Sequence, residues 1–134
     1  MEEMDESCTD FAGRTRHFRT RLEETPGGLR AETVEKGKED GYRFKVVVAT
    51  GATGQALWEL REKMHQILNT RHLERDEKTG TWLMTHDAVR GRVAFGDDHG
   101  RPKLVIDGKS LSWEDVGRMI DVYEGFEFEL RILG

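Results

Sequence analysis

The spacing of the apolar residues changes along the chain from every second residue to every third or fourth, and this change most constrains the fold. Alternation with a period of two is typical of strands with one buried face, and it predicts strands near residues 16–23, 29–36 and 42–48. From Gly54 the apolar residues form one stripe of an amphipathic helix that runs to about His72. We therefore expect three antiparallel strands in a meander, followed by a helix.

The second half of the chain shows the same succession of short strands and a helix. Alternating runs predict strands at residues 82–84, 89–95 and 104–106, and Ser112 with Asp115 predicts a capped helix start. Alternation over residues 126–132 predicts a final half-buried strand. The order βββ-α-βββ-α-β indicates an α+β two-layer sandwich, with a mainly antiparallel sheet and two helices on one face. The predicted core includes these residues: Phe44, Leu60, Phe126 and Phe128.

The charge of the chain is concentrated at its start. The 134 residues carry 21 Lys and Arg against 26 Asp and Glu, a net charge of −5, and five of the acids lie within residues 1–10. The remainder is therefore neutral, and an anionic partner is not excluded. We expect residues 1–13 to form an acidic, disordered tail and residues 14–134 a single α+β domain.

Cysteine usage and hydropathy indicate the compartment. Cys8 is the single cysteine, so no internal disulfide can form. The first residues do not show a basic region followed by an apolar stretch, as a signal peptide would, and no apolar run approaches about 18 residues. We expect a cytoplasmic protein that does not associate with a membrane.

The segment Thr50-Gly51-Ala52-Thr53-Gly54 resembles the phosphate loop of nicotinamide-binding short-chain reductases. The third glycine of that fingerprint would fall at Leu57, and no parallel strand with a ribose-binding acid follows the helix. We therefore expect no dinucleotide and no other cofactor. Chain reversal into the helix is the favoured role of Gly51 and Gly54, and a simple anion site at the helix start is the alternative.

Two acidic and imidazole clusters are candidates for metal ligands. Asp97, Asp98 and His99 fall in one predicted turn, and His86 and Asp87 fall in another. Turn chemistry explains both clusters better than a metal site, so we expect no metal. No nucleophile–base set or carboxylate pair can be assembled from the sequence, and we expect no catalytic residues.

The predicted strand registers place a surplus of basic side chains on the outer face of the sheet. The outward bases are Arg19, Arg21, Arg30, Arg43, Lys45, Arg90, Arg92, Lys103 and Arg131. The outward acids are Glu23, Glu32, Glu127 and Glu129. A solvated face with cross-strand ion pairs is the favoured interpretation, and a platform for a nucleic-acid backbone is the alternative, with Arg19, Arg21, Arg43, Lys45, Arg90, Arg92 and Lys103 as contacts.

The C-terminal third resembles an uncharacterised bacterial domain family. The resemblance covers about residues 42–133, is strongest over residues 89–133 and rests on residues 89–93, 104–108, 112–119 and 123–126. It implies a folded domain and a bacterial source, without an activity. Some relatives carry a cysteine-rich N-terminus, and this chain has only Cys8 there.

These observations favour a small cytoplasmic binding or accessory module whose partner is a protein. Binding of nucleic acid or another polyanion through the basic face is the alternative, and a small-ligand or enzyme pocket between sheet and helices is a second one. The oligomeric state and the pathway stay open at this point.

Overall fold

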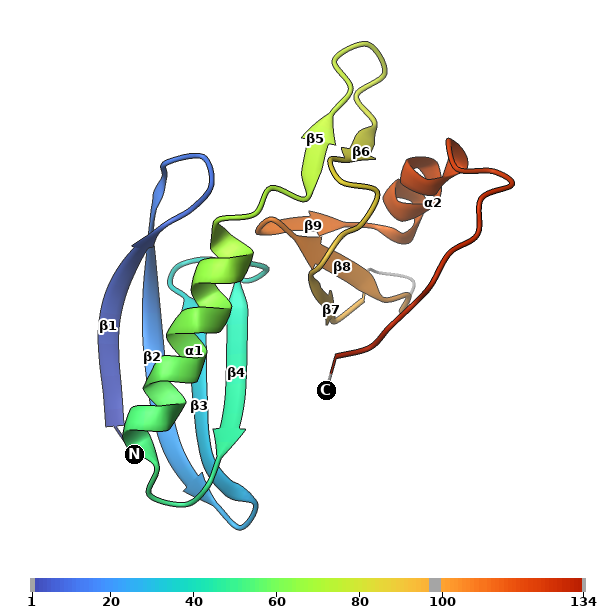
Figure 1. Ribbon diagram of the computed structural model, residues 1–134. Helices are drawn as coiled ribbons and strands as arrows, with labels where there is room; N and C mark the ends of the chain where they lie inside the picture. The colour runs from blue at the N-terminus through green and yellow to red at the C-terminus, as the bar shows by residue number, and fades with distance from the viewer. Residues whose placement is uncertain (1, 97–99, 134) are drawn as a thin grey trace.

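The computed structural model describes residues 2–96 and 100–133 (Figure 1). It is an α+β structure in which every strand pair that it describes is antiparallel, as the sequence predicts. The strands are divided among a four-stranded, a two-stranded and a three-stranded sheet. The first helix follows the four-stranded sheet, and the second helix follows the three-stranded one.

The four-stranded sheet consists of β1 (Glu2–Thr9), β2 (Thr15–Thr25), β3 (Gly28–Glu35) and β4 (Arg43–Val48), in that spatial order. Helix α1 (Thr53–Leu68) lies across one face of this sheet (Figure 1). The predicted alternation holds in β2, β3 and β4, because every second side chain points toward α1. The first core cluster comprises Phe18, Leu22, Leu29, Ala31, Tyr42, Phe44, Val48, Ala56, Leu60, Met64 and Leu68.

The acidic N-terminal residues form a strand rather than the disordered tail that we expected for residues 1–13. β1 pairs with β2 along its whole length, and two of its four acids, Glu3 and Asp5, face arginines there. Glu3 bonds to Arg21 at 2.9 Å, and Asp5 bonds to Arg19 at 3.2 Å. The prediction was wrong because these acids stabilise a strand through cross-strand partners that the local sequence does not contain.

The second half contains β5 (Leu73–Arg75) paired with β6 (Trp82–Met84), and a meander of β7 (Arg92–Ala94), β8 (Lys103–Ile106) and β9 (Lys109–Leu111). Asp107 and Gly108 have φ values of 54° and 72° and form the tight turn between β8 and β9. Helix α2 (Trp113–Asp121) begins with the predicted capping box of Ser112 and Asp115. The second core cluster comprises Leu73, Ile106, Leu111 and Met119.

Two expectations about the second half were wrong. In β7 the buried residue is Ala94, and Val93 and Phe95, which were predicted to face inward, are exposed. Residues 126–132 form no strand, and Phe126 and Phe128 are exposed rather than core residues. Alternation identifies a segment that is suited to a sheet, but a strand also needs a neighbouring edge, and residues 126–132 have none in this structure.

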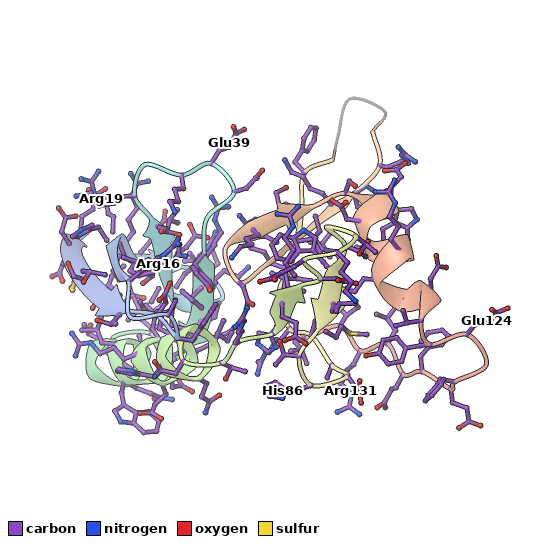
Figure 2. All side chains as sticks on the ribbon, turned by 90° about the horizontal axis from the view of Figure 1, so that it is seen from above. Arg16, Arg19, Glu39, His86, Glu124 and Arg131 are labelled. Carbon is purple, nitrogen blue, oxygen red and sulfur yellow. The ribbon has the colours of Figure 1, made fainter. Side chains whose placement is uncertain are left out.

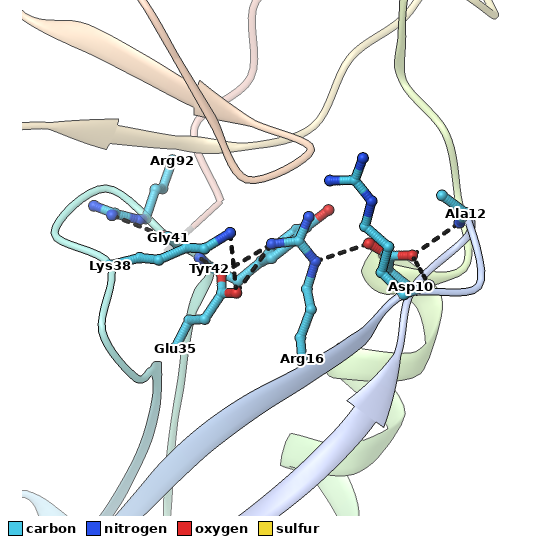
Figure 3. Close-up of polar contacts among 9 residues, drawn as sticks. Asp10, Ala12, Arg16, Glu35, Lys38, Gly41, Tyr42 and Arg92 are labelled. Carbon is cyan, nitrogen blue, oxygen red and sulfur yellow. Dashed lines mark hydrogen bonds and ion pairs between the residues drawn. The ribbon is translucent and has the colours of Figure 1, made fainter.

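A buried polar cluster of the first half lies against the turn between β8 and β9 of the second half (Figure 3). The Arg16 guanidinium donates to Asp10 at 2.8 Å and to Glu35 at 3.0 Å, and it lies 5.0 Å from the centre of the Tyr42 ring. From the other half, the Asp107 carboxylate accepts backbone N–H groups of His72 and Leu73. Burial raises the pKa of the Tyr42 hydroxyl, and the nearby charge of Asp107 raises it further. Tyr42 is therefore a protonated donor at neutral pH.

Candidate anion-binding groove

A groove of about 590 Å³ runs along β4, which is an edge strand of the four-stranded sheet. We call it the β4 groove. Its walls come from β3, β4, α1, residues 89–93 and the C-terminal residues 131–133. Seven of its lining residues are basic, namely Arg30, Arg43, Lys45, Lys63, Arg90, Arg92 and Arg131. Two are acidic, namely Glu32 and Asp107. The groove is therefore strongly cationic, although the chain as a whole is acidic.

Most of these cations have no acidic partner. Arg30 pairs with Glu32 at 3.4 Å, and Arg131 pairs with Glu129 at 2.8 Å. Within residues 2–96 and 100–133, no ion pair is formed by the other five lining cations: Arg43, Lys45, Lys63, Arg90 and Arg92. These five cations are therefore available to pair with the charged groups of a bound anion.

Like charges crowd each other in the β4 groove. Partial burial lowers the pKa of Lys63, and the charges of Arg90 and Lys45 lower it further. Burial also lowers the pKa of Arg92, with a further contribution from Arg43. Anionic groups placed between these cations would reverse this repulsion, so the electrostatics of the groove favour an anionic ligand.

Backbone carbonyl groups hold two of the cations in place. The Lys63 ammonium donates to the Lys45 carbonyl at 3.2 Å, and the Arg92 guanidinium donates to the Gly41 carbonyl at 3.0 Å (Figure 3). The latter bond joins the two halves across the groove. Each cation keeps further N–H groups for a ligand, because an ammonium has three donors and a guanidinium five.

Two residues of the groove lining also carry buried donors without a partner among the described residues. These donors are the Tyr42 hydroxyl and the Arg92 Nε. A buried donor that makes no hydrogen bond costs about 1–3 kcal/mol. A ligand oxygen or an ordered water that reached either atom would remove this cost.

The groove brings together only part of the predicted basic face. The predicted bases that line it are Arg30, Arg43, Lys45, Arg90, Arg92 and Arg131. Arg19 and Arg21 lie on the same sheet but pair with β1 acids, and Lys103 pairs with Asp40 at 2.6 Å. Sequence reasoning missed Lys63, because a lysine beside the apolar stripe of a helix looks like an ordinary solvated residue.

In the glycine loop before α1, a side chain of the same chain accepts the hydrogen bond of one backbone amide. Gly51 has a φ of 80° and its amide donates to the Glu24 carboxylate at 3.0 Å. Ala52 is the N-cap residue of α1, where the sequence suggested Thr53, and Gly54 lies in the exposed first turn. A carboxylate of the chain itself thus occupies one donor of the predicted anion site at Gly51 and Gly54.

The structure describes only one of the two candidate metal clusters, His86 with Asp87. No group of three His, Cys, Asp or Glu residues is placed to hold a metal ion within the described ranges. Asp97, Asp98 and His99 lie outside these ranges. Asp87 accepts a hydrogen bond from the Tyr123 hydroxyl at 2.6 Å, which gives this carboxylate a structural partner. Burial raises the pKa of the Cys8 thiol, so Cys8 has little thiolate character.

None of the helices in the described part of the chain is long and apolar enough to span a membrane. The fold and the groove define a small α+β protein with two joined halves and a cationic groove along one sheet edge. Residues 2–69, just over half of the chain, match the model described as Domain of unknown function (DUF7686), and the chain belongs to this family.

Residues 72–133 match a second model, Domain of unknown function (DUF7713). The predicted resemblance to an uncharacterised domain family is thus confirmed, although the region expected over residues 42–133 is divided between two models. No curated protein and no solved structure matches the chain. That residues 14–134 form a single domain stays a prediction.

Proposed function

We propose that this chain is a cytoplasmic, non-catalytic binding module, and that the β4 groove binds the phosphate backbone of a single-stranded nucleic acid. The observation that carries the proposal is the convergence of five cations without acidic partners on one groove. Phosphate contacts of this kind supply most of the affinity of non-specific nucleic-acid binding. The single cysteine supports the compartment, because a cytoplasm keeps thiols reduced.

An exposed aromatic side chain favours a single strand over a simple polyanion. Val93 lines the groove, and Phe95 follows two residues later with 95% of its surface exposed. In an extended backbone, residues two apart point to the same side, so Phe95 continues the Val93 side of the chain. Proteins that bind single strands combine a basic groove with aromatic side chains on which bases stack.

The test is the binding of short, fluorescently labelled single-stranded DNA and RNA, measured by anisotropy over a range of salt concentrations. If the five cations each contact one phosphate, log K should fall with log salt with a slope of about −3.5. Arg43→Glu/Arg90→Glu/Arg92→Glu should abolish binding. A matched control, Arg61→Glu/Lys78→Glu/Arg118→Glu, changes the net charge equally at exposed positions outside the groove and should keep it.

Inorganic polyphosphate separates stacking from charge. Phe95→Ala should weaken single-strand binding by roughly 5- to 150-fold, because one stacked base contributes about 1–3 kcal/mol, and should leave polyphosphate binding unchanged. Equal loss of binding in the groove variant and the control variant would show that only the overall charge matters. That result, or the absence of salt-sensitive binding at micromolar concentration, would refute the proposal.

A further inference from the structure

Residues 126–132 have the pattern of a strand but no neighbouring strand. Their four apolar side chains, which alternate with Glu127, Glu129 and Arg131, have between 72% and 89% of their surface exposed. The Glu129–Arg131 ion pair of 2.8 Å shows that the polar residues share one side of the segment. The segment therefore presents an apolar side and a charged side, as an edge strand does before it is paired.

β4 presents a free edge of matching length. The Tyr42 carbonyl accepts the Glu35 amide, so Tyr42 and the residues that alternate with it hydrogen-bond toward β3. The backbone groups of Arg43, Lys45 and Val47 then point to the opposite edge, where the ammonium of Lys63 covers the Lys45 carbonyl. The flexible side chain of this half-buried lysine can turn away to admit another strand. β4 has six residues, and the segment 126–132 is similarly long.

The side chains of the segment and of β4 are complementary. On the covered face, Phe44 and Val48 of β4 are buried under α1. On the other face, Arg43 and Lys45 have no acidic partner within the described residues. A strand added beside β4 with its apolar side toward α1 would place Glu127 and Glu129 near these two cations.

The segment reaches the β4 of its own chain only at its end. Its start is anchored behind α2, because the Phe126 amide donates to the Tyr123 carbonyl at 2.8 Å and Tyr123 bonds to Asp87. Figure 1 shows the segment running along the far side of the second half, and Figure 2 shows Glu124 at the end of the molecule most distant from the four-stranded sheet. Of the C-terminal residues from 126 onward, only residues 131–133 line the β4 groove.

We propose that residues 126–132 of one copy add as a fifth strand to β4 of a second copy of this chain. Main-chain hydrogen bonds to the free edge provide the contact, and the alternating side chains select the face. A reciprocal exchange satisfies both segments and closes a two-fold dimer. This inference does not depend on nucleic-acid binding, although a strand in this position and a phosphate chain would compete for Arg43 and Lys45.

The first experiment measures the molar mass of the full chain by sedimentation equilibrium over a range of concentrations. The expected result is a reversible monomer–dimer equilibrium. Phe128→Asp should dissociate the dimer and leave the fold intact, because this side chain is exposed. Trp58→Asp is the matched control, since Trp58 is an exposed aromatic residue on α1 and should not affect association.

A charge exchange then tests the pairing itself. Arg43→Glu/Lys45→Glu reverses the groove, and Glu127→Lys/Glu129→Lys reverses the segment. Each variant alone should dimerise more than about tenfold more weakly, because like charges then face each other. In a mixture, each segment meets a groove of opposite charge, so the two variants should form a heterodimer. A wild-type chain that stays monomeric, or a dimer that neither reversal weakens, would overturn the proposal.

Discussion

The buried cluster around Arg16 allows a quantitative test of how an ion-pair network stabilises one end of the four-stranded sheet. Arg16, Asp10 and Glu35 are all buried, and the two carboxylates share the charge of one guanidinium. Arg16→Met keeps much of the side-chain volume but leaves the buried Asp10 carboxylate without a cation, and Glu35 keeps only the more exposed Lys38 at 3.7 Å. Breaking a buried ion pair by removing one partner costs about 3–5 kcal/mol, and we expect a loss of stability in this range.

The pH dependence distinguishes an electrostatic cause from a packing cause. Burial tends to raise the pKa of Asp10, but hydrogen bonds from Arg16, Arg14 and Ala12 outweigh burial and hold it below the usual value. A lowered pKa in the folded state stabilises the protein above the unfolded pKa of about 4, and this stabilisation disappears as the pH falls through the folded value. Without Arg16, burial should raise the pKa of the Asp10 carboxyl. The deficit of the variant is then largest at neutral pH and shrinks in acid.

The assay is urea unfolding at several pH values between about 3 and 7, with the free energy of unfolding compared between wild type and variant. The triple variant Arg16→Met/Asp10→Asn/Glu35→Gln is the matched control. It removes all three charges, and its amide oxygens still can accept the backbone N–H groups of Ala12, Arg14 and Tyr42. It should regain at least half of the lost stability. A loss below about 1 kcal/mol, or a loss independent of pH, would refute the reasoning.

Two further predictions concern the core and the second helix. Phe44→Ala should cost about 3–5 kcal/mol of stability, because Phe44 is buried between the sheet and α1. Phe128→Ala should change the stability of the monomer by less than about 0.5 kcal/mol, because Phe128 is exposed. Thermal melts at low protein concentration compare the two variants, and similar losses would contradict the exposed placement of Phe128. Ser112→Ala should cost about 1 kcal/mol, because the Ser112 hydroxyl accepts the Asp115 amide at 3.1 Å; chemical denaturation measures it, and Ser112→Asp, which keeps an acceptor, should lose less.

The elements that local patterns define were predictable from the sequence. Residues 42–48 and the stripe from Leu57 to Leu68 fold as their periods indicate, because each buries one side against the other. The strand β1 was missed because its stability comes from partners on β2, and only Met4 and Cys8 on its inner side hint at a buried face. Residues 126–132 show the opposite case. Their alternation is clear, but a sequence pattern does not reveal whether a neighbouring strand is present to pair with them.

The candidate site was predicted in part for the same reason. Arg43 and Lys45 could be assigned to one face from the alternation of β4 alone. Their meeting with Arg90 and Arg92 depends on how the two halves join, and the Arg92–Gly41 hydrogen bond and the Lys103–Asp40 ion pair connect the halves there. The ion pairs between neighbouring strands could not be predicted either. From the sequence, Arg19 and Arg21 therefore could not be distinguished from Arg43, but in the structure they form ion pairs with Asp5 and Glu3 of β1.

The order of the strands also gives the four-stranded sheet an electrical direction. Glu3 and Asp5 lie on the outer face at one edge, and Arg43 and Lys45 lie on the same face at the other. Three strand spacings, about 14 Å, separate the two edges, so this face carries a dipole directed across the strands. In the electric field of an anionic surface, this dipole produces a torque that turns β4 toward the surface and β1 away from it. A protein with a negative net charge would thus meet an anion in one preferred orientation, and salt would weaken this alignment.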